Sequence, residues 1–298
     1  MPELPEVQTT VDGLNKKVLD RTFIDVWSDW DKLVKKPKNF TDFKKQIKGK
    51  KIIRIWRRAK NVIFELSEGW SLLIHMKMTG HLMVGVWEKN NGIWMPTQNE
   101  ALKEKINGFL HIMFFLDDGR MIALSDVRKF AKIELQLTGH LLELPEFKNL
   151  GPEPLEKSFT FKKFQEVFNN LPSGVAGKKG KIKQVIMGPN VIAGIGNIYA
   201  SEALWWAKIH PEKLAVNLNT KELKALYLAI QKVLRAGINF GGDSFSDYRN
   251  VDGQKGSFEG HKKVYQMAGK NCSRCKTKII RQLIGARSAF FCPQCQEL

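Results

Sequence analysis

Long hydrophobic runs are missing from the 298 residues of this chain. No apolar stretch approaches the roughly 20 residues that a membrane-spanning helix needs, which argues against a helical membrane protein. The opening residues, MPELPEVQ, contain two acids and no apolar core, so they do not form a secretory signal, and we expect a cytoplasmic protein. Internal repeats and low-complexity tracts are also missing. The length predicts two domains, or one domain with a small appendage.

Acidic residues are outnumbered, with 30 Asp and Glu against 48 Lys and Arg, which leaves a formal net charge of +18. Such an excess indicates a polyanionic partner, for which nucleic acid and an anionic membrane surface both qualify. A basic surface that serves only solubility is the alternative. No strongly basic amphipathic helix stands out, so the sequence favours nucleic acid over a membrane.

The first half of the chain predicts one helix followed by short strands. Val7, Val11, Leu14 and Val18 form one apolar stripe, which predicts a helix over residues 5–19 with Pro5 in its first turn. Between residues 22 and 137 the apolar pattern predicts strands at 51–56, 62–66, 109–116 and 131–137. The 109–116 segment is apolar on both faces and is expected to be central. Strands without intervening helices predict a β-sandwich.

The second half predicts helices and two loops. The polar stretch 86–107 is predicted to be an irregular loop insertion. At LGPEPL, residues 150–155, the strand-like pattern gives way to a helical one, which predicts a domain boundary. Helices are predicted at 160–170, 181–187, 197–208 and 221–236. Thr220 is expected to cap the last helix and Gly237 to end it. The glycine-rich segment 241–262 is predicted to be a long, mobile loop, and loops of this length are usually functional or disordered.

All four cysteines lie near the C-terminus, as Cys272-x-x-Cys275 and Cys292-x-x-Cys295 with 16 residues between the pairs. This spacing is typical of a four-thiolate zinc ribbon whose intervening segment forms a hairpin. Four thiolates leave no open coordination position, so we expect one structural zinc ion. Arg281 and Arg287 lie between the pairs, where either a phosphate contact or simple solvation fits the spacing.

Pro2, Glu3 and Glu6 form a second group of interest. Removal of Met1 would leave Pro2 with a free secondary amine, which can attack a sugar C1′ and form a Schiff base. Glu3 and Glu6 share a helix face and can move protons. Two glutamates in a first helical turn more often compensate the helix dipole, and the residues alone leave both interpretations open.

The chain resembles the formamidopyrimidine-DNA glycosylases of the endonuclease VIII-like superfamily. The resemblance is carried by MPELPEVQTTVDGL, RRAKNVIFEL (57–66), HMKMTGHL (75–82), SDVRKFA (125–131), LGPEPL, AGIGNIYASEALWWAKIHPEK (193–213), the glycine-rich loop and the cysteine pairs. It implies an α+β fold with an N-terminal β-sandwich and leading helix over 1–150. A helix–two-turn–helix DNA-binding domain with a lesion loop over 151–262 and a zinc-ribbon finger over 263–298 would follow.

The resemblance also implies an activity and a set of catalytic residues. A bifunctional DNA glycosylase and abasic-site lyase of base excision repair would remove 8-oxoguanine and formamidopyrimidines, then nick the strand by β,δ-elimination. Pro2 matches the nucleophile, Glu3 the proton-transferring acid, Glu6 a supporting carboxylate, and Lys60 a lysine near the lesion and its phosphate.

The implied DNA-binding residues fall into two groups. Met78, Arg128 and Phe130 match residues that fill the void left by the flipped base, and Lys129 belongs to the same motif. Lys183, Asn197 and Arg287 match phosphate contacts at the kinked DNA, with Asn197 at a helix N-terminus. Double-stranded DNA with oxidised bases is the expected partner of a monomeric, nucleoid-associated enzyme that needs no nucleotide cofactor.

Several positions depart from the family pattern or choose between its branches. Leu4 and Val7 complete PELPEV of the purine branch, whereas the pyrimidine branch typically begins PEGPE. Ala131 and Met76-Lys77 stand where glycine and Leu-Gly are usual, and Asp243, Ser244 and Ser257 are unusual in the lesion loop. The alternatives are a damage-sensing DNA binder without turnover, which a retained Met1 would favour, and an enzyme for oxidised pyrimidines.

Overall fold

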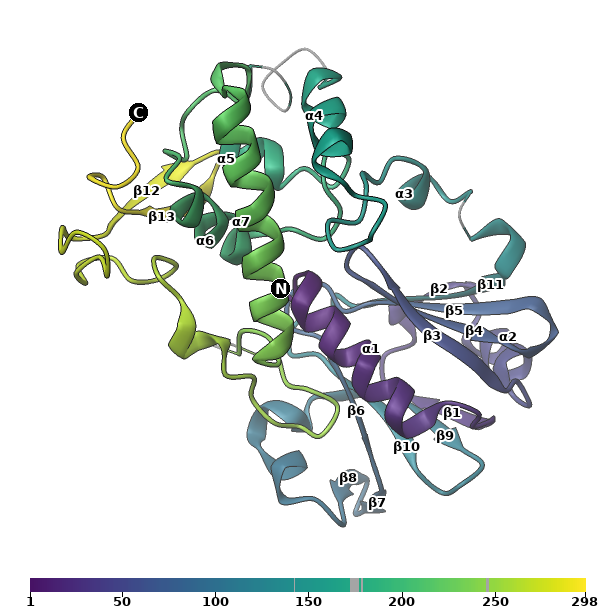
Figure 1. Cartoon of the computed structure of the whole chain (residues 1–298). Coiled ribbons are helices and arrows are strands. Elements are labelled where there is room, and N and C mark those ends of the chain that lie inside the picture. The colour runs from purple at the N-terminus through teal and green to yellow at the C-terminus, as the bar shows by residue number, and fades with distance from the viewer. Residues whose placement is uncertain (142, 172–176, 178, 245–246) are drawn as a thin grey trace. The chain divides into compact units, whose positions relative to one another are not determined.

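The computed structural model describes residues 1–141, 143–171, 177, 179–244 and 247–298, in two units (Figure 1). The first unit comprises Met1–Lys148 and Phe240–Glu259, and the second comprises Asn149–Asn239 and Gly260–Leu298. Most of the glycine-rich segment therefore packs with the N-terminal unit, whereas the sequence analysis grouped it with residues 151–262. Residues 245 and 246 of that segment lie outside the described residues. The boundaries expected at 150 and 262 stay a prediction.

The leading helix is confirmed as α1 (Leu4–Val18). Val7, Val11 and Leu14 are buried on one face, which packs against strands β3 and β4 of the five-stranded sheet described below. Pro5 lies in the first turn, where its missing N–H costs nothing, and basic residues occupy the last turn. Sequence periodicity and packing thus agree along this helix.

Two sheets follow in the first unit (Figure 1). A four-stranded antiparallel sheet has the order β1 (Phe23–Ser28), β9 (Leu110–Leu116), β10 (Met121–Ser125) and β6 (His81–Gly85). A five-stranded sheet has the order β2 (Val34–Lys36), β11 (Lys132–Leu137), β5 (Trp70–His75), β4 (Asn61–Leu66) and β3 (Ile52–Arg58). Only the β2–β11 pairing is parallel among the pairings of these described strands. The predicted strand at 109–116 is confirmed as a central one.

One hydrophobic core joins the two sheets, which confirms the predicted sandwich. Phe23 of β1 lies 6.4 Å from Phe64 of β4 and 5.5 Å from Phe114 of β9, measured between ring centroids. A further helix, α2 (Phe40–Ile47), adds Phe43 and Ile47 to this core and was not predicted. Its signal was the pair of apolar residues four apart behind Asn39, whose side chain accepts from the Asp42 N–H at 3.1 Å.

The prediction of an irregular loop at 86–107 is wrong. The segment forms a hairpin, β7 (Trp87–Asn90) and β8 (Ile93–Pro96), and two 3-10 turns, η3 (Glu100–Lys103) and η4 (Lys105–Gly108). Asn91 and Gly92 both adopt positive φ, the conformation of a two-residue hairpin turn. Trp87 is buried against Met83 and Met113, so apolar packing holds a segment that is polar on average.

Acidification is expected to destabilise the protein through His81 of β6. Burial lowers the pKa of His81 from 6.5 to about 4, although its Nε2 donates a 2.8 Å hydrogen bond to Asn107 Oδ1 that opposes the shift. The folded state therefore binds fewer protons than the unfolded chain between these values. The contribution of neutral His81 to the free energy of unfolding is fully present above pH 6.5. It is lost as the pH falls towards 4, with a slope of up to about 1.4 kcal/mol per pH unit.

Urea unfolding of the wild-type protein and of His81→Gln at several pH values measures this contribution. The variant should lose its free energy of unfolding less steeply on acidification. Equal slopes for the two proteins would show that His81 does not contribute.

The second unit is mainly helical. Its helices are α4 (Phe161–Asn169), α5 (Ile182–Ile186), α6 (Asn197–Ala207) and α7 (Thr220–Asn239), while α3 (Pro145–Lys148) belongs to the first unit. All four predicted helices are confirmed, but both predicted caps of α7 are wrong. Asn219 caps the start, because its side chain accepts from the Glu222 N–H at 3.0 Å, and the helix continues through Gly237.

A hairpin of β12 (Ile280–Ile284) and β13 (Arg287–Phe291) completes the second unit, as expected for the segment between the cysteine pairs.

Besides η3 and η4, five short 3-10 segments connect the larger elements in the described part of the chain: η1 (Asp31–Leu33), η2 (Ser67–Gly69), η5 (Thr138–His140), η6 (Ala215–Asn217) and η7 (Phe258–His261). In the described part of the chain, no helix combines the length and apolarity required to cross a membrane.

Candidate functional site

Pro2, Glu3 and Glu6 are brought together at the start of α1. Pro2 is buried, and Glu3 and Glu6 are 3% and 1% exposed. The backbone N–H of Glu3 donates to Glu6 Oε2 at 2.7 Å, and the Glu3 side chain accepts from the Glu6 backbone, so the two glutamates cap the helix reciprocally. Two carboxylates next to the chain start are thus held in fixed positions.

Glu6 also binds the glycine-rich segment. The N–H of Asp243 donates to Glu6 Oε1 at 2.8 Å, and the Tyr248 hydroxyl donates to the Glu6 carbonyl at 2.9 Å. Gly242 lies between them, where a β-carbon would approach Glu6 Cγ to 2.9 Å and Tyr248 Cε1 to 3.1 Å. Glu6 therefore positions this segment, a role that its place in the first helical turn did not reveal.

Lys60 contributes to the electrostatic surroundings of the chain start, and His75 lies opposite Asn61, the residue after Lys60, in the five-stranded sheet. Lys60 lies in the turn between β3 and β4, and its charge lowers the pKa of the Met1 amine. Burial is the larger cause of that lowered pKa, and Glu3 and Glu6 oppose it. Burial also lowers the pKa of His75 to about 3, with smaller effects from neighbouring lysines, so His75 is neutral near pH 7.

Met78, Arg128 and Phe130 lie on two turns that a buried contact joins. Thr79 Oγ1 donates to Asp126 Oδ1, and Asp126 Oδ2 accepts from the N–H of Phe130 at 2.7 Å and of Ala131 at 2.8 Å. Thr79 Oγ1 also accepts from the Arg128 N–H at 3.1 Å. One carboxylate, with no solvent exposure, thereby holds both turns, and sequence reasoning missed it.

The side chains on these turns are exposed although two of them are large and apolar. Met78 is 41% exposed and Phe130 is 51% exposed. The Arg128 guanidinium lies 4.5 Å from the centre of the Phe130 ring, and the Lys129 ammonium lies 4.7 Å from that of Trp30. Two apolar side chains beside two cations form a surface suited to bases and phosphates.

Replacing Asp126 is expected to destabilise the first unit. In Asp126→Asn, an amide replaces the carboxylate that accepts hydrogen bonds from the N–H groups of Phe130 and Ala131. This change is expected to lower the free energy of unfolding by about 1–3 kcal/mol. Asp117→Asn, at a partly exposed turn, serves as the control and should change it by less than about 0.5 kcal/mol. Equal, small effects in urea unfolding would contradict the assigned role.

In the second unit, Asn197 and Arg287 line one groove of about 550 Å³, together with Arg281, Ser288 and Phe290. Asn197 is the first residue of α6, and its Oδ1 is buried without a hydrogen-bond partner among the described residues. Arg281 donates to Ser288 Oγ at 2.9 Å across the hairpin. The exposed arginines and the helix N-terminus are suited to an anion such as phosphate.

The Lys183 side chain is not exposed in this groove. Its side chain is 1% exposed, and Nζ donates to the Ser288 carbonyl at 2.7 Å and to Ser201 Oγ at 3.1 Å. The lysine thus ties α5 and α6 to the hairpin. Its expected contact with DNA stays a prediction.

The four cysteines meet at one point of the second unit. Cys275 Sγ lies 3.4 Å from both Cys292 Sγ and Cys295 Sγ, and all four sulfurs lie within 4.8 Å of one another. Tetrahedral zinc with Zn–S bonds of about 2.3 Å separates its sulfurs by about 3.8 Å, so the cluster fits one zinc ion. The predicted ligand set is therefore consistent with a structural Zn²⁺.

Three family models match successive parts of the chain. A model described as the formamidopyrimidine-DNA glycosylase N-terminal domain matches residues 1–133, and one described as the formamidopyrimidine-DNA glycosylase H2TH domain matches residues 150–249. A zinc finger found in FPG and IleRS matches residues 269–298. Together these models cover the sandwich, the helical domain and the finger.

Relatives and solved structures agree over the whole chain. The formamidopyrimidine-DNA glycosylases of Desulfitobacterium hafniense and Chloroflexus aggregans are 36% and 37% identical, covering 99% and 100% of this chain and 100% and 99% of those proteins. Lactococcus lactis FPG (MutM) in complex with DNA containing FAPY-dG has a TM-score of 0.83 at 30% identity, covering 99% of this chain and 100% of that one. MutM in complex with DNA containing carbocyclic 8-oxo-G has a TM-score of 0.82 at 32% identity, with 100% of both chains covered. The chain therefore belongs to the formamidopyrimidine-DNA glycosylase family and is a DNA glycosylase of DNA repair.

Proposed function

We propose that this enzyme excises 8-oxoguanine and formamidopyrimidines from duplex DNA through a Schiff base on Pro2 and then cleaves the strand by β,δ-elimination. The buried pair of Glu3 and Glu6 beside Pro2 carries the proposal. The similar solved structures contain DNA with FAPY-dG, 8-oxo-G or an abasic site, which supports these substrates.

In the proposed first step, the neutral Pro2 amine bonds to C1′ while the glycosidic C1′–N9 bond breaks. The base leaves with that electron pair and takes up the proton that the Pro2 nitrogen loses. Glu3 then donates a proton to O4′ as the C1′–O4′ bond opens, which produces an iminium ion. Burial of the chain start favours the neutral amine, as it lowers the pKa of the Met1 amine in the unprocessed chain.

In the later steps, the iminium accepts electrons while the C3′–O3′ bond breaks, and the C5′–O5′ bond follows. Each cleavage removes one carbon-bound proton and releases one phosphate. Lys60, on the turn between β3 and β4, is assigned to the phosphate beside the lesion. Glu6 holds the glycine-rich segment 240–259, which we assign to cover the flipped base.

Exposure and charge support the DNA-binding roles that the family resemblance implies. Met78 and Phe130 are exposed and would fill the space of the extruded base, with Arg128 facing the unpaired base opposite. Lys129 in the same turn, and Asn197 and Arg287 in the groove of the second unit, are assigned to phosphates. The zinc ion held by the four cysteines would fold the finger that carries Arg287.

Borohydride trapping tests this proposal. Protein without Met1, incubated with 8-oxoguanine duplex and sodium borohydride, should form a covalent protein–DNA adduct. Undamaged duplex should form no adduct. Protein that retains Met1 should form none either, because its Pro2 nitrogen is an amide and cannot attack C1′. If processed, zinc-bound protein binds the damaged duplex but is never trapped, the Schiff-base mechanism is wrong and a DNA binder without turnover remains.

A further inference from the structure

The 86–107 segment contacts the glycine-rich segment at a turn, residues 250–254. Asn250 Oδ1 accepts from the N–H groups of Asp252 and Gln254, which closes the turn on itself. Asn99 Nδ2 donates to the Asp252 carbonyl at 3.0 Å, and Asn107 Nδ2 donates to the Gly253 carbonyl at 3.0 Å. Two asparagines of one segment therefore hold the backbone of the other.

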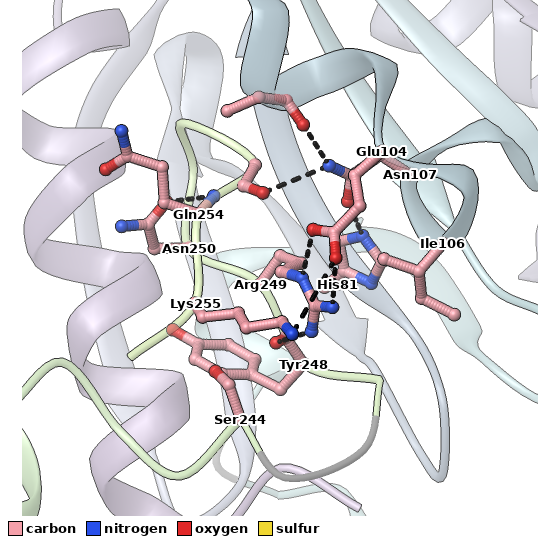
Figure 2. Close-up of polar contacts among 12 residues, drawn as sticks. His81, Glu104, Ile106, Asn107, Ser244, Tyr248, Arg249, Asn250, Gln254 and Lys255 are labelled. Carbon is pink, nitrogen blue, oxygen red and sulfur yellow. Dashed lines mark hydrogen bonds and ion pairs between the residues drawn. The ribbon is translucent and has the colours of Figure 1, made fainter. Parts of the chain in front are cut away.

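Glu104 and Arg249 add an ion pair next to this turn (Figure 2). Arg249 Nε donates to Glu104 Oε2 at 2.7 Å and Nη2 donates to Oε1 at 2.8 Å, so the contact is bidentate. Arg249 is 4% exposed. The hydrogen bonds from Arg249 lower the pKa of Glu104, which keeps the carboxylate charged. A buried arginine depends on such a partner.

The ion pair is linked to Glu6 through Tyr248. Arg249 follows Tyr248 in the chain, and its Nη1 donates to the Tyr248 carbonyl at 2.8 Å. The Tyr248 ring is buried, and its hydroxyl bonds the Glu6 carbonyl and lies 3.3 Å from Thr10 Oγ1. Figure 2 shows Tyr248, Arg249 and Glu104 in succession. The position of Tyr248, and with it that of Gly242 against Glu6, is thus linked to the 86–107 segment.

We propose that the 86–107 segment is a brace for the base-covering segment, and that Glu104 and Arg249 are positioning residues required for base excision and not for cleavage of a pre-formed abasic site. This inference rests on the proposed function. Pro2 and Glu3 immediately precede α1, whose main packing partners are strands β3 and β4 and not the 86–107 segment. An abasic site has no base to cover, so only the base-dependent step needs the braced segment.

Single-turnover kinetics on two matched duplexes tests the proposal. One duplex carries 8-oxoguanine opposite cytosine and the other an abasic site at the same position. Glu104→Gln and Arg249→Gln should each slow base release by about 10- to 100-fold, because small misplacements of a positioning group have effects of this size. Cleavage of the abasic duplex should change by less than about threefold.

Three further variants make the test specific to the pair. Glu100→Gln removes a carboxylate of the same segment that is 86% exposed and pairs with Lys103, and it should leave base release unchanged. The double variant Glu104→Gln/Arg249→Gln should be no slower than either single variant, since the pair acts as a unit. Glu104→Asp keeps the charge and should restore part of the rate. Thermal unfolding of each variant identifies any that does not fold.

Two results would overturn the proposal that the 86–107 segment is a brace. Base release by folded Glu104→Gln at the wild-type rate would show that the pair positions nothing. Equal losses on both duplexes would show a general structural role. A wild-type protein that is inactive on both duplexes overturns the proposed function itself, a result distinct from any difference between variants.

Discussion

Glu3→Gln is expected to slow formation of the Schiff base on 8-oxoguanine duplex by about 10²–10⁴-fold, the contribution typical of a positioned general acid. Glu3 is 3% exposed and fixed at the start of α1, so bulk water cannot easily replace its proton. The amide has the same shape and still accepts a hydrogen bond from the helix, which preserves the fold. Single-turnover formation of the borohydride-trapped adduct with 8-oxoguanine duplex measures the effect.

A matched control separates catalysis from charge. Glu68→Gln makes the same chemical change at a side chain that is 71% exposed in η2, and it should leave the rate within about twofold. DNA affinity should be similar for both variants, because removal of one acid cannot weaken phosphate contacts. Glu3→Gln with a wild-type rate would exclude Glu3 as the proton donor.

Loss of one zinc ligand is expected to have the second large effect. Cys292→Ala should abolish binding of one zinc ion per chain and unfold the β12–β13 hairpin, because zinc contributes about 10–16 kcal/mol to the folding of such small sites. Arg281 and Arg287 lie on this hairpin, and Lys183 donates to its Ser288 carbonyl. Affinity for abasic-site duplex should therefore fall by about 100-fold or more, the order expected when several phosphate contacts are lost.

Zinc content by metal analysis and DNA affinity at one fixed salt concentration measure this effect. Ser273→Ala, an exposed position between Cys272 and Cys275, is the control and should retain zinc and affinity. If Cys292→Ala kept one equivalent of zinc and bound DNA normally, the four-thiolate site would be wrong.

Local patterns predicted those elements whose packing follows one period. The stripe of Val7, Val11 and Leu14 predicted α1, and apolar alternation predicted β4 and β11 within one or two residues. A run that is apolar on both faces predicted β9. The cysteine spacing predicted the metal site and the hairpin between the pairs. In each case neighbours in the sequence share one surface, so their order along the chain carries the signal.

The failures fall where distant residues decide the structure. Trp87 and Trp94 lie in short apolar groups within a polar stretch, and packing against remote side chains of the first unit stabilises β7 and β8. Gly237 was expected to end α7, but the helix continues to Asn239. Propensity at a helix end is worth only about 1 kcal/mol, less than the burial of the Val233 and Leu234 face beside it.

The chemical groups follow from residue identity and order alone: an amine-bearing Pro2 once Met1 is removed, two acids beside it, four thiols at ligand spacing and an excess of cations. Tertiary structure alone decided which of these groups are held and by what. Asp126 joins two turns, Glu104 pairs with Arg249 across 145 residues, and the Lys183 side chain is buried. Such contacts join residues far apart in the chain, so no local period or spacing records them, and they exist only because the packed core brings their elements together.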